Sequence, residues 1–237
     1  MKRMMSGAIA LTGSLLMAAA GAEAQAIEMS GNVSIVSDYS YRGISQTQEE
    51  PAIQGGIDLA LPAMLYAGAW GSSVNFGEDV PGPDRPAMEL DLYGGFAPAV
   101  AGFDVDLGAI YYLYPGAATG MGYDFWEIYS GLSRGVGPLG LGVSLAYSPD
   151  FFGDTGEAVW AGLDASTEIP STPFTIDGSF GRQTVEEAFD YNAWSAGIST
   201  ELLGTSFGAS ITGTDAESDV CDEICDTRLI LSVGRSL

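Results

Sequence analysis

The sequence predicts an all-β fold, a closed antiparallel transmembrane β-barrel of about twelve strands and of the outer-membrane type. Three observations support this prediction. Apolar residues alternate with small or polar residues along segment after segment, longer and shorter connections follow one another in turn, and acidic residues lie on the face opposite to the apolar one. A barrel with an apolar outside and a water-filled interior accounts for all three.

Alternation with a period of two residues marks each expected strand. In one segment Leu139, Leu141, Val143 and Leu145 alternate with glycine, serine and alanine residues. This period places successive side chains on opposite faces of a strand, and almost nothing in the chain has the period of a helix. There are twelve such segments: 27–43, 52–61, 64–76, 88–97, 102–114, 123–133, 138–148, 157–169, 173–182, 191–201, 204–213 and 226–237.

The connections between these segments alternate in length. Short turns at one end and longer loops at the other are typical of outer-membrane barrels, whose two termini both lie on the periplasmic side. A barrel in lipid must also close, because hydrocarbon does not tolerate unpaired strand edges, so the first and last strands should be neighbours. The longer connections are 44–51, 77–87, 115–122, 149–156, 183–190 and 214–225, and the shorter ones are 62–63, 98–101, 134–137, 170–172 and 202–203.

The N-terminus has the pattern of a secretory signal peptide. A basic start precedes an apolar stretch over 8–21, and Ala22-Glu23-Ala24 matches a small-x-small cleavage site. The apolar stretch is shorter than the ~20 residues that a membrane-spanning helix needs. We therefore expect residues 1–24 to be removed and residues 25–237 to form a single barrel domain in the outer membrane.

Composition excludes several classes of function. The chain has no histidine, which removes Ser-His-Asp and Cys-His catalysis and histidine-ligated zinc, so we expect neither an enzyme nor a cofactor. The formal net charge is −23, and Lys2 is the only lysine. Nucleic acid is therefore not an expected partner, because its binding needs a basic surface.

Charged residues in the expected strands fall on one face. If the apolar face contacts lipid, the charged residues point into the lumen, where water removes the cost of burying unpaired carboxylates in a dry core. A lumen lined by acidic groups favours cations over anions. The residues expected to line the pore are Asp38, Arg42, Asp58, Glu89, Asp91, Asp104, Asp106, Glu127, Asp164, Asp177 and Arg228.

Arg42 and Arg228 are the two basic residues in this set. We expect Arg42 to end the first strand and Arg228 to begin the last one, so that barrel closure brings them together near Asp38. Opposed arginines and carboxylates would form a charged constriction that selects permeant ions. The alternative is a cluster of salt bridges that only joins the first strand to the last, and the residues alone leave both open.

Aromatic residues gather beside the longer loops. Amphipathic rings favour the membrane–water interface, so this distribution predicts one girdle of an outer-membrane barrel. The alternative is a sugar-stacking platform built on Tyr111, Tyr112, Tyr114, Phe151 and Phe152, which a girdle makes unnecessary. The gathered residues are Tyr39, Tyr41, Tyr111, Tyr112, Tyr114, Tyr123, Phe125, Trp126, Tyr147, Phe151, Phe152, Tyr191 and Trp194.

The last long connection, TDAESDVCDEICD, is acidic and contains both cysteines. In an exported chain, Cys221 and Cys225 should form a disulfide. The spacing of the acidic residues is similar to that of a calcium-binding loop, but Val220 stands where an EF-hand needs glycine. An acidic surface loop is therefore the main expectation, and the alternative is a divalent-cation site with the ligands Asp215, Glu217, Asp219, Glu223 and Asp226.

Several short motifs run through nearly the whole mature chain. The most specific begins with SDY at Ser37 and continues with RGISQT from Arg42, PA from Pro51 and QGG from Gln54; the others are YAGAW, ELDLYGGF, YYLYPG, EIYSGLS, AYSPDFF and CDTRLILSVGRSL. In these motifs the chain resembles the TorF family of porin-like proteins from proteobacteria, whose function is not known. The resemblance implies an outer-membrane barrel with the architecture of a porin. The chain departs from many such barrels in ending at Leu237 rather than at an aromatic residue.

The expected function is that of a porin-like outer-membrane channel for passive, cation-favouring diffusion of small polar solutes. The alternative is a non-conducting barrel that acts as a structural or surface-interaction protein through its acidic loops. Expected partners are outer-membrane lipid, lipopolysaccharide bridged to acidic loops by divalent ions, and small polar or cationic solutes.

Overall fold

The computed structural model describes residues 27–77, 85–217 and 221–237, so the expected signal peptide at 1–24 lies outside the described residues. No helix in these ranges is long and apolar enough to cross a membrane. The elements are β1 (Glu28–Val36), β2 (Ser40–Tyr41), β3 (Ile44–Ser45), β4 (Ala52–Leu61), η1 (Pro62–Met64), β5 (Leu65–Ser73), β6 (Met88–Phe96), β7 (Ala99–Val100), β8 (Phe103–Leu113), β9 (Phe125–Val136), β10 (Leu139–Ser148), β11 (Ala158–Glu168), β12 (Phe174–Val185), β13 (Tyr191–Leu202), β14 (Thr205–Thr214), η3 (Asp222–Cys225) and β15 (Arg228–Ser236).

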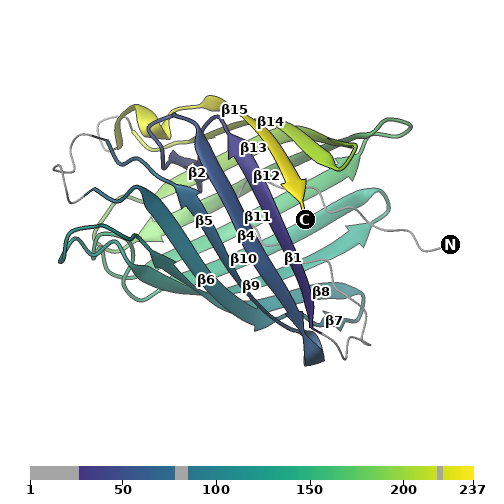
Figure 1. The fold of residues 1–237 in the computed structure, drawn as a ribbon, viewed down its shortest axis with the longest axis horizontal. Helices are drawn as coiled ribbons and strands as arrows, with labels where there is room; N and C mark the ends of the chain where they lie inside the picture. Colours follow the sequence, from purple (N-terminus) through teal and green to yellow (C-terminus); the bar gives the residue numbers. More distant parts are fainter. Residues whose placement is uncertain (1–26, 78–84, 218–220) are drawn as a thin grey trace.

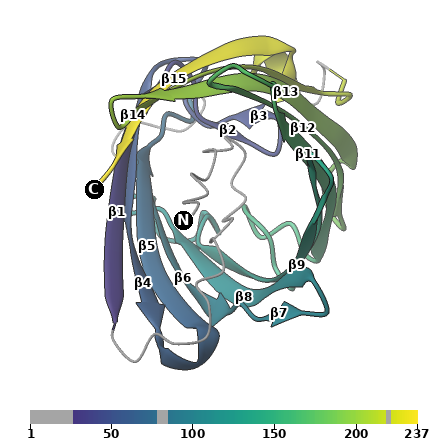
Figure 2. The ribbon, with the colours of Figure 1, turned by 90° about the vertical axis from the view of Figure 1, so that its right-hand side faces the viewer.

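The strands form one closed antiparallel barrel, which confirms the predicted fold class (Figures 1 and 2). Each wall strand pairs with the next wall strand in the chain, and β6 pairs with β8. The first strand, β1, pairs with the last, β15, in a register that places Asn32 opposite Ser236. Twelve strands therefore make the wall, because β7 is only a two-residue addition that pairs with β8.

The outer surface of the wall is apolar. Many large side chains on it keep between about 40% and 60% of their area exposed, for example Leu141 at 43%, Leu145 at 55% and Ile35 at 60%. A surface of this kind around a whole barrel would be strongly unfavourable in water, where each square ångström of apolar area costs about 25 cal/mol, and it is what lipid tails contact. The alternating burial along the strands confirms that the apolar face points outward.

Glycines on the wall make room for tyrosine rings that lie across neighbouring strands. Tyr93 is paired with Gly68, and a β-carbon on that glycine would lie 2.4 Å from the tyrosine ring. Tyr129 covers Gly108 in the same way, also at 2.4 Å. Such contacts explain part of the high glycine content, because a ring that lies flat on the wall needs a neighbour without a side chain.

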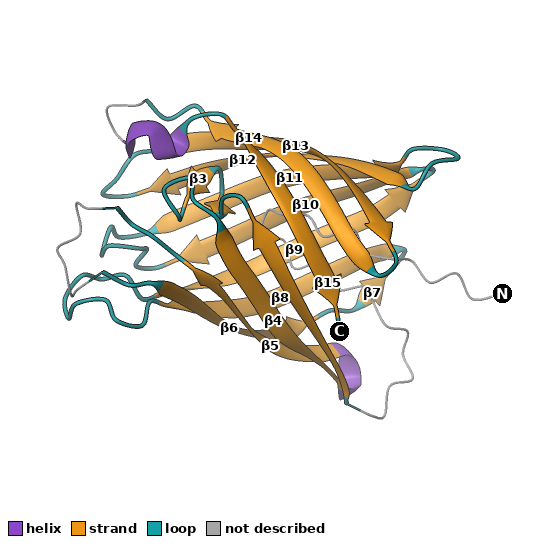
Figure 3. Cartoon of the chain, turned by 45° about the horizontal axis from the view of Figure 1, so that its top comes forward, coloured by secondary structure: helices purple, strands orange, loops and turns teal. Residues whose placement is uncertain are grey.

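The two ends of the barrel differ, as the connection lengths predict (Figure 3). The longer connections gather at one end, which we call the loop end, and the short ones at the other, which we call the turn end. Because β1 runs from the turn end and β15 returns to it, the barrel begins and finishes at the turn end. Arg134, expected in a turn, instead lies in β9, which continues to Val136.

The first expected strand, 27–43, is wrong in its second half. The wall strand β1 stops at Val36, and the chain then turns into the lumen, where β2 and β3 form a separate two-stranded sheet inside the ring of strands (Figure 2). We call residues 38–47 the inner hairpin. Its two-residue turn is Arg42-Gly43, with φ of 47° and 90°, the backbone that a tight hairpin turn needs.

The predicted aromatic girdle is also mostly wrong. Tyr112, Tyr114, Phe125 and Tyr191 are buried inside the barrel. Only part of the set faces outward, such as Trp126 at 44% exposed. The physical reason is the two-residue period of a strand, since Tyr111 and Tyr112 are consecutive and cannot both face lipid. At the loop end Tyr112, Tyr114 and Phe125 form one cluster with Val74 and Ile110, against which these side chains pack: Tyr39, Tyr41, Phe76, Tyr123, Phe151 and Phe152.

Candidate functional site

The base of the inner hairpin is fixed to the seam between β1 and β15. The Ser37 amide donates to the Leu231 carbonyl at 2.8 Å, which keeps the start of the segment on the wall. Asp38 accepts hydrogen bonds from the hydroxyls of Ser45, at 2.5 Å, and Thr47, at 2.8 Å. It also accepts one from Arg228 Nε, and the two side chains form a buried ion pair. The carboxylate of Asp38 therefore ties both strands of the hairpin to β15.

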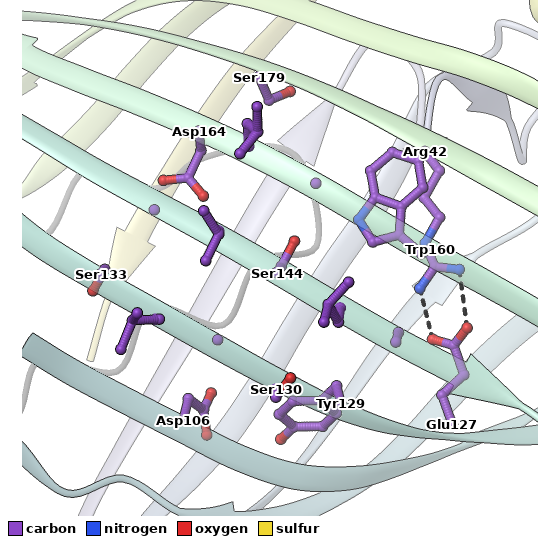
Figure 4. A pocket seen from close by; sticks show the side chains of 18 of the residues that line it. Arg42, Asp106, Glu127, Tyr129, Ser130, Ser133, Ser144, Trp160, Asp164 and Ser179 are labelled. Atoms are coloured by element: carbon purple, nitrogen blue, oxygen red, sulfur yellow. Dashed lines mark hydrogen bonds and ion pairs between the residues drawn. The ribbon is translucent and has the colours of Figure 1, made fainter.

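The Arg42 side chain, at the tip of the hairpin, reaches the opposite wall. Arg42 Nη1 and Nη2 donate to Glu127 Oε1 and Oε2 on β9 at 2.9 and 2.7 Å, a bidentate ion pair that Figure 4 shows. Arg42 Nη1 also donates to Gln183 Oε1 on β12 at 2.8 Å. Both β9 and β12 lie across the ring from β1 (Figure 2). The Arg42 side chain therefore crosses the lumen, while the backbone of the hairpin tip stays beside β13, β14 and β15, where Arg228 donates to the Gly43 carbonyl.

The surroundings of Arg42 keep its charge in place. Burial would lower the pKa of this guanidinium, but the Glu127 carboxylate raises it, and the net result is a pKa above the ordinary value. The guanidinium also lies over the rings of Tyr41, at 4.7 Å from the centroid, and Trp160, at 5.1 Å. Tyr112 adds a hydrogen bond to Glu127 at 3.1 Å. Arg42 is thus held as a cation by a carboxylate and two aromatic faces.

The side of the hairpin is fixed to β6. The Tyr39 hydroxyl donates to Glu89 Oε1 at 2.6 Å, and the Tyr114 hydroxyl donates to Glu89 Oε2 at the same distance. Burial, followed by the Glu89 charge, raises the pKa of both phenols, so they act as neutral donors. The ring of Tyr39 meets Trp70 of β5 edge to face at 5.4 Å. The hairpin is therefore held on three sides: at the seam, at β9 with β12, and at β5 with β6.

Beneath the hairpin lies a polar chamber, which Figure 4 shows from close by. It is a cavity of about 210 Å³ with Tyr41, Arg42 and Glu127 at its hairpin end. Its wall comes mainly from β8 to β13. The polar side chains that line it include Asp104, Asp106, Ser130, Ser133, Ser144, Asp164 and Ser179. An acidic, hydroxyl-rich chamber of this kind can hold water and small polar or cationic solutes.

The structure places the remaining residues of the expected pore lining at several levels. Asp58 accepts a hydrogen bond from Tyr93 on the lumen face of the wall. Glu89 and Asp91 are buried beside the hairpin. Asp177 is half-buried, on the same face of β12 as Ser179.

The expected place of Arg228 is confirmed, because it begins β15 and pairs with Asp38, but the expectation that Arg42 lies beside it on the wall is wrong. Arg42 pairs with Glu127 on the far wall, whereas Arg228 pairs with Asp38 at the seam. The physical reason is the turn of the chain after Val36, which carries Arg42 off the wall. What links the two arginines is the hairpin itself, because Arg228 Nη1 donates to the Gly43 carbonyl at 3.0 Å.

The described part of the acidic last loop does not gather ligands around one point. Cys221 and Cys225 are joined by a disulfide. Asp215 accepts bonds from the backbone and side-chain nitrogens of Asn192, both at 2.6 Å, and these bonds lower its pKa. Asp219 lies outside the described residues. Within the ranges that the structure describes, no group of three or more acidic or cysteine side chains is arranged for a metal ion.

The aromatic residues weighed as a sugar platform share no exposed surface. Tyr111 is exposed on the outside of β8, whereas Tyr112 on its other face and Tyr114 just after its end are buried inside the barrel. Phe151 and Phe152 pack into the aromatic cluster at the loop end. Their rings therefore serve packing.

A family model described as "Bacterial protein of unknown function (Gcw_chp)" matches residues 19–237. The chain belongs to this family. No curated protein matches the sequence of this Gcw_chp member.

Solved structures of outer-membrane channels share the fold of this Gcw_chp barrel. The KdgM porin superposes with a TM-score of 0.60 at 7% identity, covering 88% of this chain and 99% of that one. The NanC porin gives 0.56 at 10% identity, covering 87% and 98%. The COG4313 outer-membrane channel from Pseudomonas putida F1 gives 0.55 at 9% identity, covering 88% and 95%. At these identities the similarity concerns the fold alone, which is that of outer-membrane barrels.

Sequence reasoning missed the partners that hold the hairpin in this Gcw_chp member. Gln183, Trp160 and Tyr112 contact Arg42 or Glu127 from strands far away in the sequence, and no local pattern marks them. One signal was available. The stretch SYRGIS has a glycine at the second position of a two-residue connection between short alternating segments, which is a feature of tight hairpins.

Proposed function

We propose that this barrel is a porin-like outer-membrane channel for passive diffusion of small polar solutes, with the inner hairpin as its constriction. The observation that carries the proposal is the Arg42–Glu127 ion pair. Through it, a segment that the Asp38–Arg228 pair anchors at the β1–β15 seam is also bound to β9 on the other side of the lumen. A loop folded into the lumen narrows a barrel without breaking its wall. Both chain ends would then lie on the periplasmic side, because the barrel begins and finishes at its turn end.

Charge in the chamber supports a preference for cations. Asp104, Asp106 and Asp164 line the cavity, whereas Arg42, the one basic residue among the described residues that line it, is already matched by Glu127. A lumen of one sign concentrates ions of the opposite sign and repels ions of its own. We infer that small cations and neutral polar solutes pass more readily than anions.

The sequence resemblance to the TorF family of porin-like proteins supports the same function. So does the fold shared with the KdgM and NanC porins, whose printed names describe them as porins. With no histidine in the chain, a catalytic role that needs this residue is not proposed.

Planar-bilayer recording of the refolded protein tests the proposal. Discrete current steps are expected, and in a salt gradient the reversal potential should have the sign of a cation-selective pore. Persistent silence would contradict the channel and favour the non-conducting barrel, in which the tied hairpin is a permanent plug and the acidic loops meet other surface molecules. A reversal potential of the opposite sign would contradict the charge argument alone.

A further inference from the structure

Arg42 fills a site that the barrel wall builds for a guanidinium group. Glu127 of β9 accepts hydrogen bonds from Nη1 and Nη2 at 2.9 and 2.7 Å, and Gln183 of β12 accepts one from Nη1 at 2.8 Å. These two acceptors are 2% and 0% exposed. Trp160 of β11 lies beneath the group, with the guanidinium carbon 5.1 Å from the ring centroid. Three wall strands therefore supply two acceptors and one aromatic face to a single cation.

The wall groups of this site are also held by contacts that do not involve Arg42. The Tyr112 hydroxyl donates to Glu127 Oε2 at 3.1 Å. The indole of Trp160 lies over Gly181, where a side chain would overlap its ring. The ring can therefore rest on the wall and turn one face to the lumen. The site is a feature of the wall, and the hairpin contributes Arg42 as its occupant.

The side chain of Arg42 can leave this site without moving the backbone of the hairpin. The tip is anchored separately, because Arg228 Nη1 donates to the Gly43 carbonyl at 3.0 Å and Gly43 lies beside Thr214. The rotatable bonds of one side chain join the guanidinium to this anchored backbone. A change of rotamer is therefore enough to open the site.

The site is reached from the polar chamber. Arg42, Glu127 and Trp160 are among the residues that line this cavity of about 210 Å³. Asp104 and Asp164 line it as well, and neither belongs to an ion pair between described residues. Asp104 is exposed and Asp164 is half-buried, so both carboxylates keep contact with water. They attract cations into the space from which the Arg42 site is entered.

The geometry of the site selects a guanidinium group over an ammonium group. A carboxylate that accepts two N–H bonds side by side, an amide oxygen next to it and an aromatic face together fit a flat cation with several donors in one plane. An ammonium group is a compact point charge, which cannot bridge both carboxylate oxygens in this way and stack on the indole at the same time.

We propose that Glu127, Gln183 and Trp160 form a binding site for guanidinium-bearing solutes, which Arg42 occupies in their absence and which they take by displacing it. Competition with a tethered group weakens the apparent affinity for the solute, and a weakly held solute can leave again, as passage through a channel requires. That the channel passes such solutes rests on the proposed function, whereas their binding does not.

Chemical rescue of Arg42→Ser tests the site. The refolded full chain is titrated at constant ionic strength with agmatine, which has a guanidinium and an amine on a butyl chain, or with putrescine, which has two amines on the same chain. The readout is the thermal unfolding midpoint. Agmatine should raise the midpoint of Arg42→Ser at a concentration about tenfold lower than putrescine does, because a ligand that binds only the folded state stabilises it by mass action. Adding Glu127→Gln to Arg42→Ser should abolish this difference between the probes.

The wild type tests the exchange. It should respond to agmatine at a concentration about tenfold higher than Arg42→Ser requires, because the tethered Arg42 competes for the site. Arg182→Ser, which breaks an exposed ion pair and keeps Arg42, should respond as the wild type does.

Two results would overturn the proposal. Equal responses of Arg42→Ser to agmatine and putrescine would refute the site, and a wild type that agmatine never stabilises, or stabilises as readily as Arg42→Ser, would refute the exchange. If Arg42→Ser does not fold alone, its refolding yield with each probe, measured by heat-dependent gel mobility, decides: a higher yield with agmatine supports the site and equal yields refute it. Silence in a bilayer would refute the channel and leave these binding results unchanged.

Discussion

Arg42 is the residue on which the position of the inner hairpin depends most. Its guanidinium makes three hydrogen bonds to Glu127 and Gln183 and lies against two rings, at a place where water does not screen the charge. A buried ion pair is a weak source of net stability, but the loss of one partner leaves the other charge buried and alone. The pair therefore acts mainly to specify where the hairpin sits.

Replacing Arg42 with serine should free the tip of the hairpin and leave Glu127 uncompensated. The expected result is a loss of about 3–5 kcal/mol in unfolding free energy if the tip stays in place, or a smaller loss with a larger conductance if the hairpin moves away. Cation preference should rise in either case, because a positive charge leaves the lumen. Denaturant unfolding and single-channel recording measure these effects.

Arg182→Ser is the matched control for this variant. Arg182 also pairs with a carboxylate, Asp190, but the two side chains are 50% and 44% exposed. An exposed pair contributes at most about 1 kcal/mol, so stability and conductance should stay close to those of the wild type. Equal effects of the two arginine variants would show that the Arg42 pair has no special place in the lumen.

The inner hairpin has the sequence pattern of a wall strand but lies in the lumen. Residues 37–43 keep the alternation of β1, yet they leave the wall, because the same period fits a strand in a polar lumen as well as one in lipid. The contacts of the hairpin decide whether the segment lies in the wall or in the lumen. They include the Asp38–Arg228 ion pair and the Arg42–Glu127 ion pair. These contacts join residues far apart in sequence, so no local pattern could reveal them.

Gly43→Val should unseat the hairpin. Gly43 has a φ of 90°, and a β-carbon there would lie 2.6 Å from Thr214 Cγ2 and 3.0 Å from the Ala193 β-carbon. The wall should remain closed, as heat-dependent gel mobility would show, while conductance rises. Gly102→Val is the control, because Gly102 has a similar φ of 82° but nothing within 4 Å of its β-carbon position. A conductance change of equal size in both variants would mean that backbone strain, and not the position of the hairpin, determines the conductance.

The phenols at the hairpin should make stability depend on alkaline pH. Burial, together with the Glu89 charge for Tyr39 and Tyr114, raises the pKa of Tyr39, Tyr41 and Tyr114 above the ordinary value of about 10. For a raised pKa, the stabilising contribution is complete below pH ~10 and is lost as the pH rises through the folded-state value.

Tyrosinate absorbance of the folded barrel measures this effect. Some of the 11 tyrosines should stay un-ionised above pH ~10 until the protein unfolds, and Tyr39→Phe should reduce their number by one. A single reversible titration of all the tyrosines near pH ~10, without unfolding, would contradict the buried hydrogen bonds to Glu89.

At the scale of the whole molecule, the wall could be predicted from sequence and the contents of the lumen could not. The strand expected at 52–61 is β4 (Ala52–Leu61), and that expected at 191–201 is β13 (Tyr191–Leu202). Lipid outside and water inside impose a period of two on every wall strand, so the pattern is local and readable. The aromatic residues show the limit, because a ring at the loop end satisfies an interface and a buried cluster equally well, and Tyr112 and Phe125 lie in the cluster.

The central claim is that the closed barrel conducts and that the inner hairpin sets its constriction. The most direct test compares the single-channel conductance of the wild type with that of a variant in which residues 38–47 are replaced by a short Gly-Ser linker. Both proteins should show the gel mobility shift of a folded barrel. We predict discrete steps for the wild type and steps of several-fold larger conductance for the variant, whereas equal conductance, or silence from both folded proteins, would contradict the claim.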